Sequence, residues 1–259
     1  MSYGEYPDVS GETYRPERRF GVGTEELLDA YRSADHPGWK TEFAYSLLEL
    51  AYEEAFETGD DQVARALHEE VAKPHVRFCF GTRDEQPEAG IDALEDELAS
   101  IDGENATYSG EARLVREFAS PRQEPYSFPD YHHPYQAFID DLEAAVAPED
   151  YDTVVGVWSS GLPLADLAAD WIDPDHELVI RYSPSRGDDE VLPAPSTQDY
   201  CDNLEEASIL LVDDVAQTGE SVRNVIDWLQ EQNTQHIDVA LMRSMDSSPF
   251  SEKPVLTEV

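Results

Sequence analysis

Lysine and positive charge are scarce in this chain of 259 residues. It has three lysines, Lys40, Lys73 and Lys253, and 17 basic side chains face 57 acidic ones, which gives a formal net charge of −40. Nucleic-acid binding needs a basic patch, and the sequence has none, so we expect no nucleic-acid partner. An acidic surface with little lysine is typical of proteins that work in concentrated salt, where charges are strongly screened. We therefore expect a halophilic source.

Long apolar runs and cysteines are also rare. No apolar run approaches the ~18 residues that a membrane-spanning helix needs, so we expect no membrane partner. The first residues lack the basic and apolar segments of a signal peptide. The two cysteines, Cys79 and Cys201, lack metal-site spacing and are expected to be buried or free thiols in a reducing cytoplasm. These absences predict a cytoplasmic protein.

One stretch of the second half combines a hydrophobic strand, two carboxylates and a small polar loop. Residues 209–212 are aliphatic, as in a strand buried on both faces, and Asp213 and Asp214 follow directly. The loop 216–221 leads into a helix with an apolar stripe that starts at Val222. Loop amides and a helix start can bind a phosphate, and paired carboxylates suit ribose hydroxyls or Mg²⁺. This order predicts a site for a phosphorylated sugar.

The same stretch resembles a known family motif. The run Val212-Asp213-Asp214-Val215-Ala216-Gln217-Thr218-Gly219-Glu220-Ser221 is similar to the phosphoribosyl-pyrophosphate (PRPP) loop of the type I phosphoribosyltransferases. The family pattern is a hydrophobic strand, two acidic residues, three variable positions, Thr-Gly, any residue, and Ser or Thr, and every position matches. The resemblance implies that Asp213 and Asp214 hold the ribose hydroxyls of PRPP. It implies that the 5′-phosphate is wrapped by Ala216, Gln217, Thr218, Gly219, Glu220 and Ser221.

The resemblance also implies Mg²⁺ as the cofactor. The ion would arrive with PRPP rather than occupy a dedicated protein site, and Asp213 or Asp214 could contact it.

Other interpretations of the acidic pair are weaker. Receiver domains also open with a strand and two aspartates, but they need about a hundred further residues, and only 45 follow Asp214. A P-loop needs Gly-x4-Gly-Lys-Ser/Thr, and none of the three lysines lies in that setting. A purely structural acidic turn between strand and helix remains an alternative.

The chain divides near residue 125, in a stretch rich in proline and tyrosine (121–134). Residues 1–125 are expected to be a mostly helical extension without an assigned role. Within it, residues 1–22 read as a polar arm, and 75–80 form an apolar run of uncertain type. Helical patterns cover 24–57 with a break near Pro37, 61–72, 91–100 and 110–119.

Residues 126–259 are expected to form the core of the resemblance. Strand patterns at 153–158, 177–182, 209–212 and 237–242 alternate with helical patterns at 162–171 and 222–230, after a first helix at 135–146. This alternation predicts an α/β fold, a doubly wound and mainly parallel sheet of the type I phosphoribosyltransferase kind. The polar segment 183–206 is predicted to be a mobile loop, in the place of the family's flexible loop.

Ligands of such sheets collect at the carboxyl ends of the strands. The residues expected there are 158–161, 181–186, 213–221 and Arg243. From residue 126 onward the chain has only five basic side chains, and three of them, Arg181, Arg186 and Arg243, fall at this edge. Such placement suggests a bound anion, although the arginines could instead neutralise nearby carboxylates.

Ser159, Ser160 and Gly161 lie where the family carries its pyrophosphate-binding loop. Many members have an Arg or Lys in that loop, and this chain has none. Our hypothesis is that Arg181, assisted by Arg186, supplies the missing charge, which would make Arg181 a catalytic residue together with Asp213 and Asp214.

The resemblance implies a pentosyltransferase that moves ribose 5-phosphate from PRPP to a nitrogenous base and releases pyrophosphate. Its partners would be PRPP and a base or nucleoside monophosphate, and the protein could form a homodimer. Family enzymes for 6-oxopurines have Asp before Thr-Gly, where this chain has Gln217, so we lean away from hypoxanthine, guanine and xanthine. The alternative is a non-catalytic PRPP- or nucleotide-sensing regulatory protein on the same fold.

Overall fold

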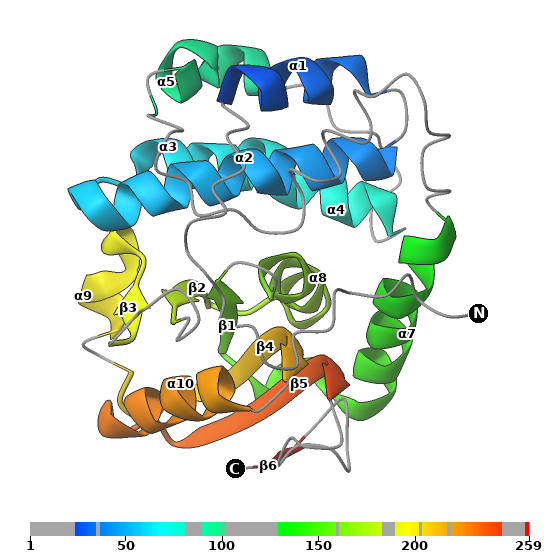
Figure 1. Ribbon diagram of the computed structural model, residues 1–259. Coiled ribbons are helices and arrows are strands. Elements are labelled where there is room, and N and C mark those ends of the chain that lie inside the picture. Colours follow the sequence, from blue (N-terminus) through cyan, green and yellow to red (C-terminus); the bar gives the residue numbers. More distant parts are fainter. Residues whose placement is uncertain are drawn as a thin grey trace, which may run out of the picture.

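The fold combines a layer of helices with an α/β sheet (Figure 1). The computed structural model describes residues 24–34, 37–80, 90–99, 101, 129–158, 161–182, 190–201, 204–216, 219–244 and 257–258. The regions expected to be an arm (1–22), a loop (81–89) and a helix (110–119) lie outside the described residues.

The first half of the described chain is helical, as predicted. Its elements are α1 (Thr24–Ser33), α2 (Pro37–Thr58), α3 (Gln62–Leu67), the π-helix η1 (His68–Ala72), α4 (Lys73–Cys79), the 3₁₀ helix η2 (Gly90–Leu94) and α5 (Glu95–Ala99). The break near Pro37 falls between α1 and α2, which confirms that expectation.

The second half alternates strands and helices. Its helices are α7 (Pro129–Ala145), η4 (Pro148–Asp150), α8 (Leu162–Ile172), η6 (Pro195–Thr197), α9 (Gln198–Cys201) and α10 (Glu220–Glu231). Its strands are β1 (Thr153–Trp158), β2 (His176–Arg181), β3 (Leu192–Pro193), β4 (Ser208–Ala216), β5 (His236–Ser244) and β6 (Thr257–Glu258).

The six strands form one sheet in the order β3-β2-β1-β4-β5-β6. The four inner strands are parallel, and the two-residue edge strands β3 and β6 are antiparallel to their neighbours. Thr153 of β1 pairs with His176 on one side and Ile209 on the other, so the inner strands start in register. The predicted α/β fold with a mainly parallel, doubly wound sheet is confirmed.

Alternate residues of the strands face two different hydrophobic layers. On one face, side chains such as Val155, Ile209 and Val239 pack against the apolar stripe of α10. On the other face, side chains such as Val154 and Leu210 pack against α7 and α8. Both faces are therefore covered, which explains why the strands read as continuous apolar runs.

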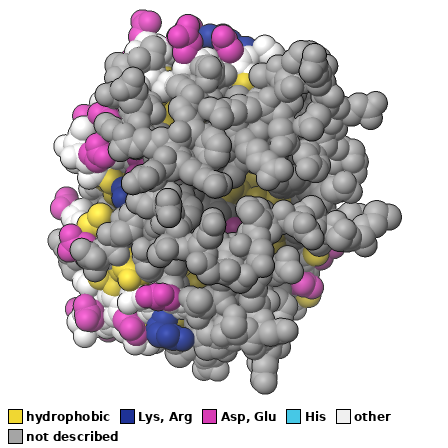
Figure 2. Space-filling model, in the orientation of Figure 1, with side chains coloured by type: hydrophobic (Ala, Val, Ile, Leu, Met, Phe, Trp, Pro, Cys, Tyr) yellow, Lys and Arg dark blue, Asp and Glu magenta, His cyan; other side chains and the backbone are white. Residues whose placement is uncertain are grey.

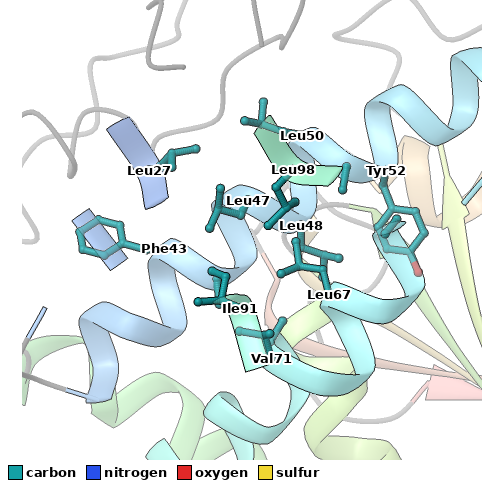
Figure 3. Packing of buried hydrophobic residues seen from close by; sticks show 14 of the residues in the cluster. Leu27, Phe43, Leu47, Leu48, Leu50, Tyr52, Leu67, Val71, Ile91 and Leu98 are labelled. Carbon is teal, nitrogen blue, oxygen red and sulfur yellow. The ribbon is translucent and has the colours of Figure 1, made fainter. Parts of the chain in front are cut away.

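The helical layer has a core of its own (Figure 3). Leu47 and Leu48 of α2 are fully buried and meet Leu67 of α3 and Val71 of η1. Burying a leucine side chain contributes about 1.5–3 kcal/mol. The same cluster continues into the sheet half through Trp158, Leu162, Val179 and Ala194.

A continuous helical run from α3 to α4 is interrupted by the π-helix η1. Pro74 follows directly, at the start of α4. A proline inside a helix removes one hydrogen bond and clashes with the carbonyl four residues earlier, and a wider turn before it relieves both problems. The expected helix end near residue 72 was therefore wrong, because the run continues to Cys79 and includes all but the last residue of the uncertain stretch 75–80.

Ion pairs join this run to the sheet half. His68 contacts Asp166 of α8, Lys73 Nζ lies 2.6 Å from Glu177 Oε2 of β2, and Arg77 Nε lies 2.9 Å from Asp170 Oδ1 of α8. In Figure 1, α8 lies between the sheet and the helices α2 and α4. The helical layer thus rests on the sheet half through charged contacts as well as apolar ones.

Two segments differ from the sequence expectation. α7 begins at Pro129, inside the stretch expected to be a connector, and proline is well suited to the first position of a helix. Within the expected loop 183–206, residues 192–193 form β3, 195–197 form η6 and 198–201 form α9, so for these residues the loop prediction was wrong. Residues 183–189 lie outside the described residues.

The described surface is strongly acidic. On the described parts of the face in Figure 2, Asp and Glu side chains are spread over several elements, while Lys and Arg occur at isolated points. None of the helices in the described part of the chain combines the length and apolar character needed to cross a membrane.

Candidate functional site

The carboxyl ends of the parallel strands meet at one edge of the sheet, as the sequence predicts. Trp158 ends β1 and pairs in register with Arg181, the last residue of β2. Gly156 of β1 pairs with Val212 of β4, which places the acidic pair one step further along the neighbouring strand. β4 does not stop at Val212 but continues to Ala216, because β5 is long enough to pair with it.

Asp213 is almost fully buried at this edge, with 6% of its surface exposed. Its Oδ1 accepts a hydrogen bond from the backbone N–H of Asp214 at 2.8 Å. Burial, followed by the neighbouring Asp214 carboxylate, raises the pKa of Asp213 well above its ordinary value, and the backbone hydrogen bond offsets only part of this. A carboxyl held in this way carries its proton far more readily than an exposed aspartate.

Gly161 lies directly against the acidic pair. A Cβ atom at this position would be 2.8 Å from the carbonyl oxygens of Val157 and Val212 and 2.9 Å from the Cα of Asp213. Only glycine fits such a close backbone approach. Its carbonyl accepts the first hydrogen bond of α8, from Ala165 N–H at 2.9 Å. The start of α8 is thereby fixed beside Asp213, as expected for the loop that ends at Gly161.

The turn after β4 leads into α10 through Gly219. Gly219 has φ +71° and ψ +13°, a left-handed conformation that disfavours other residues. Its carbonyl accepts the N–H of Arg223 at 3.0 Å, which starts the helix. Glu220 is exposed and Ser221 is half-buried in the first turn. The first turn of a helix presents free N–H groups, the arrangement that favours an anion.

Arg181 is paired with a residue that the sequence did not single out. Its Nη1 donates to Glu53 Oε2 of α2 at 2.8 Å, and the same carboxylate accepts from Trp158 Nε1 through Oε1 at 3.0 Å. The guanidinium lies 5.5 Å from the ring centroid of Phe56. Glu53 could not be predicted from the sequence, because nothing in its helical spacing separates it from the other glutamates of α2.

Residues 137–254 match the family model of the phosphoribosyl transferase domain. The matched segment, which is somewhat less than half of the chain, is similar to that domain. The matched range contains the four inner strands, α8 and α10, and therefore both Gly161 and the acidic pair. The family resemblance of the motif at 212–221 is confirmed.

Solved structures with some similarity include phosphoribosyltransferases. A purine phosphoribosyltransferase from Pyrococcus horikoshii Ot3 is 16% identical with a TM-score of 0.36, covering 48% of this chain and 78% of that chain. A hypothetical protein from Neisseria gonorrhoeae with bound ppGpp is 17% identical with a TM-score of 0.37, covering 48% and 73%. A hypoxanthine phosphoribosyltransferase from Staphylococcus aureus is 17% identical with a TM-score of 0.34, covering 44% and 65%. No curated protein matches the chain. Similarity at this level does not identify a substrate.

The structure brings together part of the predicted site of the phosphoribosyltransferase domain. Asp213 and Gly161 are in contact, and Asp214, Gly219, Glu220 and Ser221 follow on the same segment. Arg181 lies at the end of β2, which pairs with β1 and is separated from β4 by that strand. The predicted residues Ser159, Ser160, Arg186, Gln217 and Thr218 lie outside the described residues, and of Ala216 only the backbone, at the end of β4, is described.

The described residues of the phosphoribosyltransferase domain contain no group of three His, Cys, Asp or Glu side chains able to hold a metal ion. The two carboxylates at the end of β4 offer oxygen ligands of the kind that Mg²⁺ prefers. An ion held there would need further ligands from a bound molecule. That Mg²⁺ would come with a phosphorylated ligand stays a prediction.

A small cavity lies where the helical layer meets α8 and β2. It measures about 70 Å³ and is lined by side chains that include Tyr52, His68 and Asp166. Its volume suits a few water molecules, not a phosphorylated sugar. We regard it as part of the contact between the two halves.

Proposed function

We propose that this protein transfers ribose 5-phosphate from PRPP to a nitrogen atom of a base and releases pyrophosphate. One observation carries the proposal. Within a phosphoribosyltransferase domain, the buried Asp213 lies against Gly161, and the half-buried Asp214 follows it on the segment that reaches the left-handed Gly219. This combination supports a site that takes a ribose between a phosphate-binding helix start and a close-packed backbone loop.

Asp213 and Asp214 are proposed to bind the ribose hydroxyls. Burial removes the hydrogen bonds that water would make to the Asp213 carboxylate. Hydroxyl groups of a bound ribose would supply hydrogen bonds in their place, and this favours the ionised form of Asp213. The sugar becomes positively charged as its bond to pyrophosphate breaks, so a nearby carboxylate stabilises the transition state. The free protein holds Asp213 ready to ionise when the positive charge develops.

The two phosphorylated ends of PRPP are proposed to bind on either side of the acidic pair. Ala216, Gln217, Thr218, Gly219, Glu220 and Ser221 would hold the 5′-phosphate at the start of α10. Ser159, Ser160 and Gly161 would hold the pyrophosphate, with Arg181 and Arg186 as its cations. Mg²⁺ contacted by Asp213 or Asp214 would supply further positive charge for the leaving group.

The acceptor is proposed to be a base other than hypoxanthine, guanine or xanthine, because Gln217 stands where enzymes for those bases have Asp. The protein is proposed to work in the cytoplasm of a halophilic cell, without nucleic acid or membrane partners, and to form a homodimer. The acidic described surface supports the proposal of a halophilic source and of no nucleic-acid partner.

Pyrophosphate release from PRPP tests the proposal directly. The full chain is incubated in concentrated salt with Mg²⁺ and a panel of bases, and pyrophosphate is measured. Release that depends on one base is the expected result, and the Asp213→Asn variant should abolish it. If PRPP binds in calorimetry but none of the bases leads to release of pyrophosphate, the enzymatic proposal is overturned.

A second function is favoured by one observation. The guanidinium of Arg181 is already paired with Glu53, which weakens it as a cation for the leaving group. A non-catalytic protein that senses PRPP or a nucleotide would need the binding site without strong stabilisation of the leaving group. Binding of PRPP without turnover in the assay above would support this alternative.

A further inference from the structure

Glu53 lies across the ends of two neighbouring strands. One carboxylate oxygen accepts the indole N–H of Trp158 at the end of β1, and the other accepts Arg181 Nη1 at the end of β2. The side chains of Glu53 and Arg181 are 12% and 17% exposed, so water screens this pair weakly. A residue of the helical layer therefore reaches the edge of the phosphoribosyltransferase domain where the acidic pair lies.

Arg181 is one of only five basic side chains from residue 126 onward. An anion that binds to its guanidinium has to compete with a carboxylate that is already there. Glu53 is part of the same chain and sits on a helix that is packed in the core, so its effective concentration beside Arg181 is high. The pair therefore lowers the affinity of this edge for any anion that needs Arg181.

A bound anion can replace the Glu53 carboxylate at Arg181 without leaving Glu53 unpartnered. When Arg181 turns to another anion, Glu53 keeps the N–H of Trp158 as a donor. Pyrophosphate can meet the guanidinium with two oxygens, as a carboxylate can, but it carries several negative charges and so competes better than a single carboxylate. The ring of Phe56 supports the guanidinium from one side in the paired arrangement.

We propose that Glu53 is a specificity-determining residue, a tethered competitor that weakens pyrophosphate binding at Arg181 and so eases its release after transfer. The identity of the ligand as pyrophosphate rests on the proposed function. The competition itself rests on the contacts of Glu53. A ligand that lacks the pyrophosphate group, such as a nucleoside 5′-monophosphate, does not need Arg181 and is unaffected by Glu53.

The Glu53→Gln variant tests the proposal because it removes the negative charge and keeps the size of the side chain. Calorimetry of the full chain with magnesium pyrophosphate should show binding at least about tenfold tighter than in the unchanged protein, because the variant leaves the buried guanidinium without its counter-charge. Binding of a nucleoside 5′-monophosphate should stay the same. A purely structural role would predict weaker binding of both ligands.

Two matched variants locate the effect. Glu57→Gln removes an exposed carboxylate one turn later on α2 and should change neither affinity. The double variant Glu53→Gln with Arg181→Gln should lose the gain in pyrophosphate affinity that Glu53→Gln alone shows. If Glu53→Gln does not fold, Glu53→Asp draws the carboxylate back by one methylene and should give a smaller gain in the same direction.

The outcomes separate this inference from the proposed function. Unchanged or weaker pyrophosphate binding in folded Glu53→Gln, or a gain that survives the loss of Arg181, would overturn the role of Glu53 alone. If the unchanged protein binds neither PRPP nor pyrophosphate but Glu53→Gln binds pyrophosphate, the competition stands and the transferase proposal fails. If neither protein binds either ligand, both fail.

Discussion

His68 Nε2 lies 2.9 Å from both carboxylate oxygens of Asp166, and this pair joins the helical layer to α8. Burial lowers the pKa of His68, but the charge and hydrogen bond of Asp166 outweigh it and raise the pKa above its ordinary 6.5. Glu69 adds to the rise and Lys73 opposes it. Tyr45 donates a hydrogen bond to the same Asp166 carboxylate, and Tyr52 OH is 3.5 Å from His68 Nδ1. The folded protein therefore favours the charged imidazole.

Stability should fall as the pH rises above 6.5 because of this pair. A histidine whose pKa is raised by folding contributes stability that is fully present below the unfolded value of 6.5 and is lost as the pH rises through the folded pKa. Denaturant titrations at a series of pH values should show this decrease, and His68→Gln should flatten it. His176→Gln, outside the cluster, should keep the slope, and equal slopes for His68→Gln and the unchanged protein would refute the prediction.

Asp213→Asn should stabilise the free protein at neutral pH while it removes function. The raised pKa of Asp213 means that the folded state binds a proton more tightly than the unfolded chain, so stability is lost as the pH rises above about 3.8 toward the folded pKa. Asparagine avoids this loss, and each pKa unit corresponds to about 1.4 kcal/mol. Thermal unfolding at pH 3 and pH 7 shows whether the variant is more or less stable than the unchanged protein. Asp227 is exposed, so Asp227→Asn serves as the control. A destabilised Asp213→Asn protein at pH 7 would contradict the expectation.

Gly161→Ala should lower stability by about 1–3 kcal/mol, the usual cost of overpacking. The added methyl would lie 2.8 Å from two backbone carbonyl oxygens, so the backbone has to move. Gly90→Ala is the matched control, because its nearest contact would be 3.4 Å. Chemical denaturation measures both variants. The movement should also weaken PRPP binding, and two variants with equal stability would argue against a tight contact at Gly161.

Arg181→Ala should distinguish ligands with and without pyrophosphate. Loss of one charge-assisted contact costs about 1.5–3 kcal/mol, roughly ten- to a hundredfold in affinity. We expect this loss for PRPP and pyrophosphate and a small change for a nucleoside monophosphate, measured by calorimetry. The variant leaves Glu53 without its cation, so Arg181→Ala with Glu53→Gln serves as the control for folding. Equal weakening of all ligands would assign Arg181 to the fold or to the 5′-phosphate.

The sequence predicted those helices and strands whose pattern of apolar residues lies within one continuous segment. The inner strands, α8 and α10 follow from apolar runs and helical spacing, and the motif at 212–221 placed the acidic pair correctly at the carboxyl edge. The two-residue strands β3 and β6 were missed, because so short a run carries no pattern. β4 proved longer than predicted, since two aspartates argue against a strand unless a neighbour such as β5 offers paired backbone.

The part of the candidate site contributed by the helical layer had no signal in the sequence. Glu53 and Arg181 are separated by 128 positions, and their pairing depends on how α2 lies on the ends of β1 and β2. The same holds for His68 and Asp166, which are 98 positions apart. Such contacts arise from tertiary packing, which local spacing does not encode.

The π-helix η1 sets the rotational register of everything after it in the helical run. In a regular α-helix, His68 and Lys73 would point about 140° apart, since each residue turns by about 100°. The wider turn brings them to one side, so that His68, Lys73 and Arg77 meet Asp166, Glu177 and Asp170. A chain shortened by one residue here, for example at exposed Glu70, would return to regular α geometry and turn two of these three cations away from their carboxylates. The charged contacts between the helical layer and the sheet half thus depend on a single extra residue in this turn.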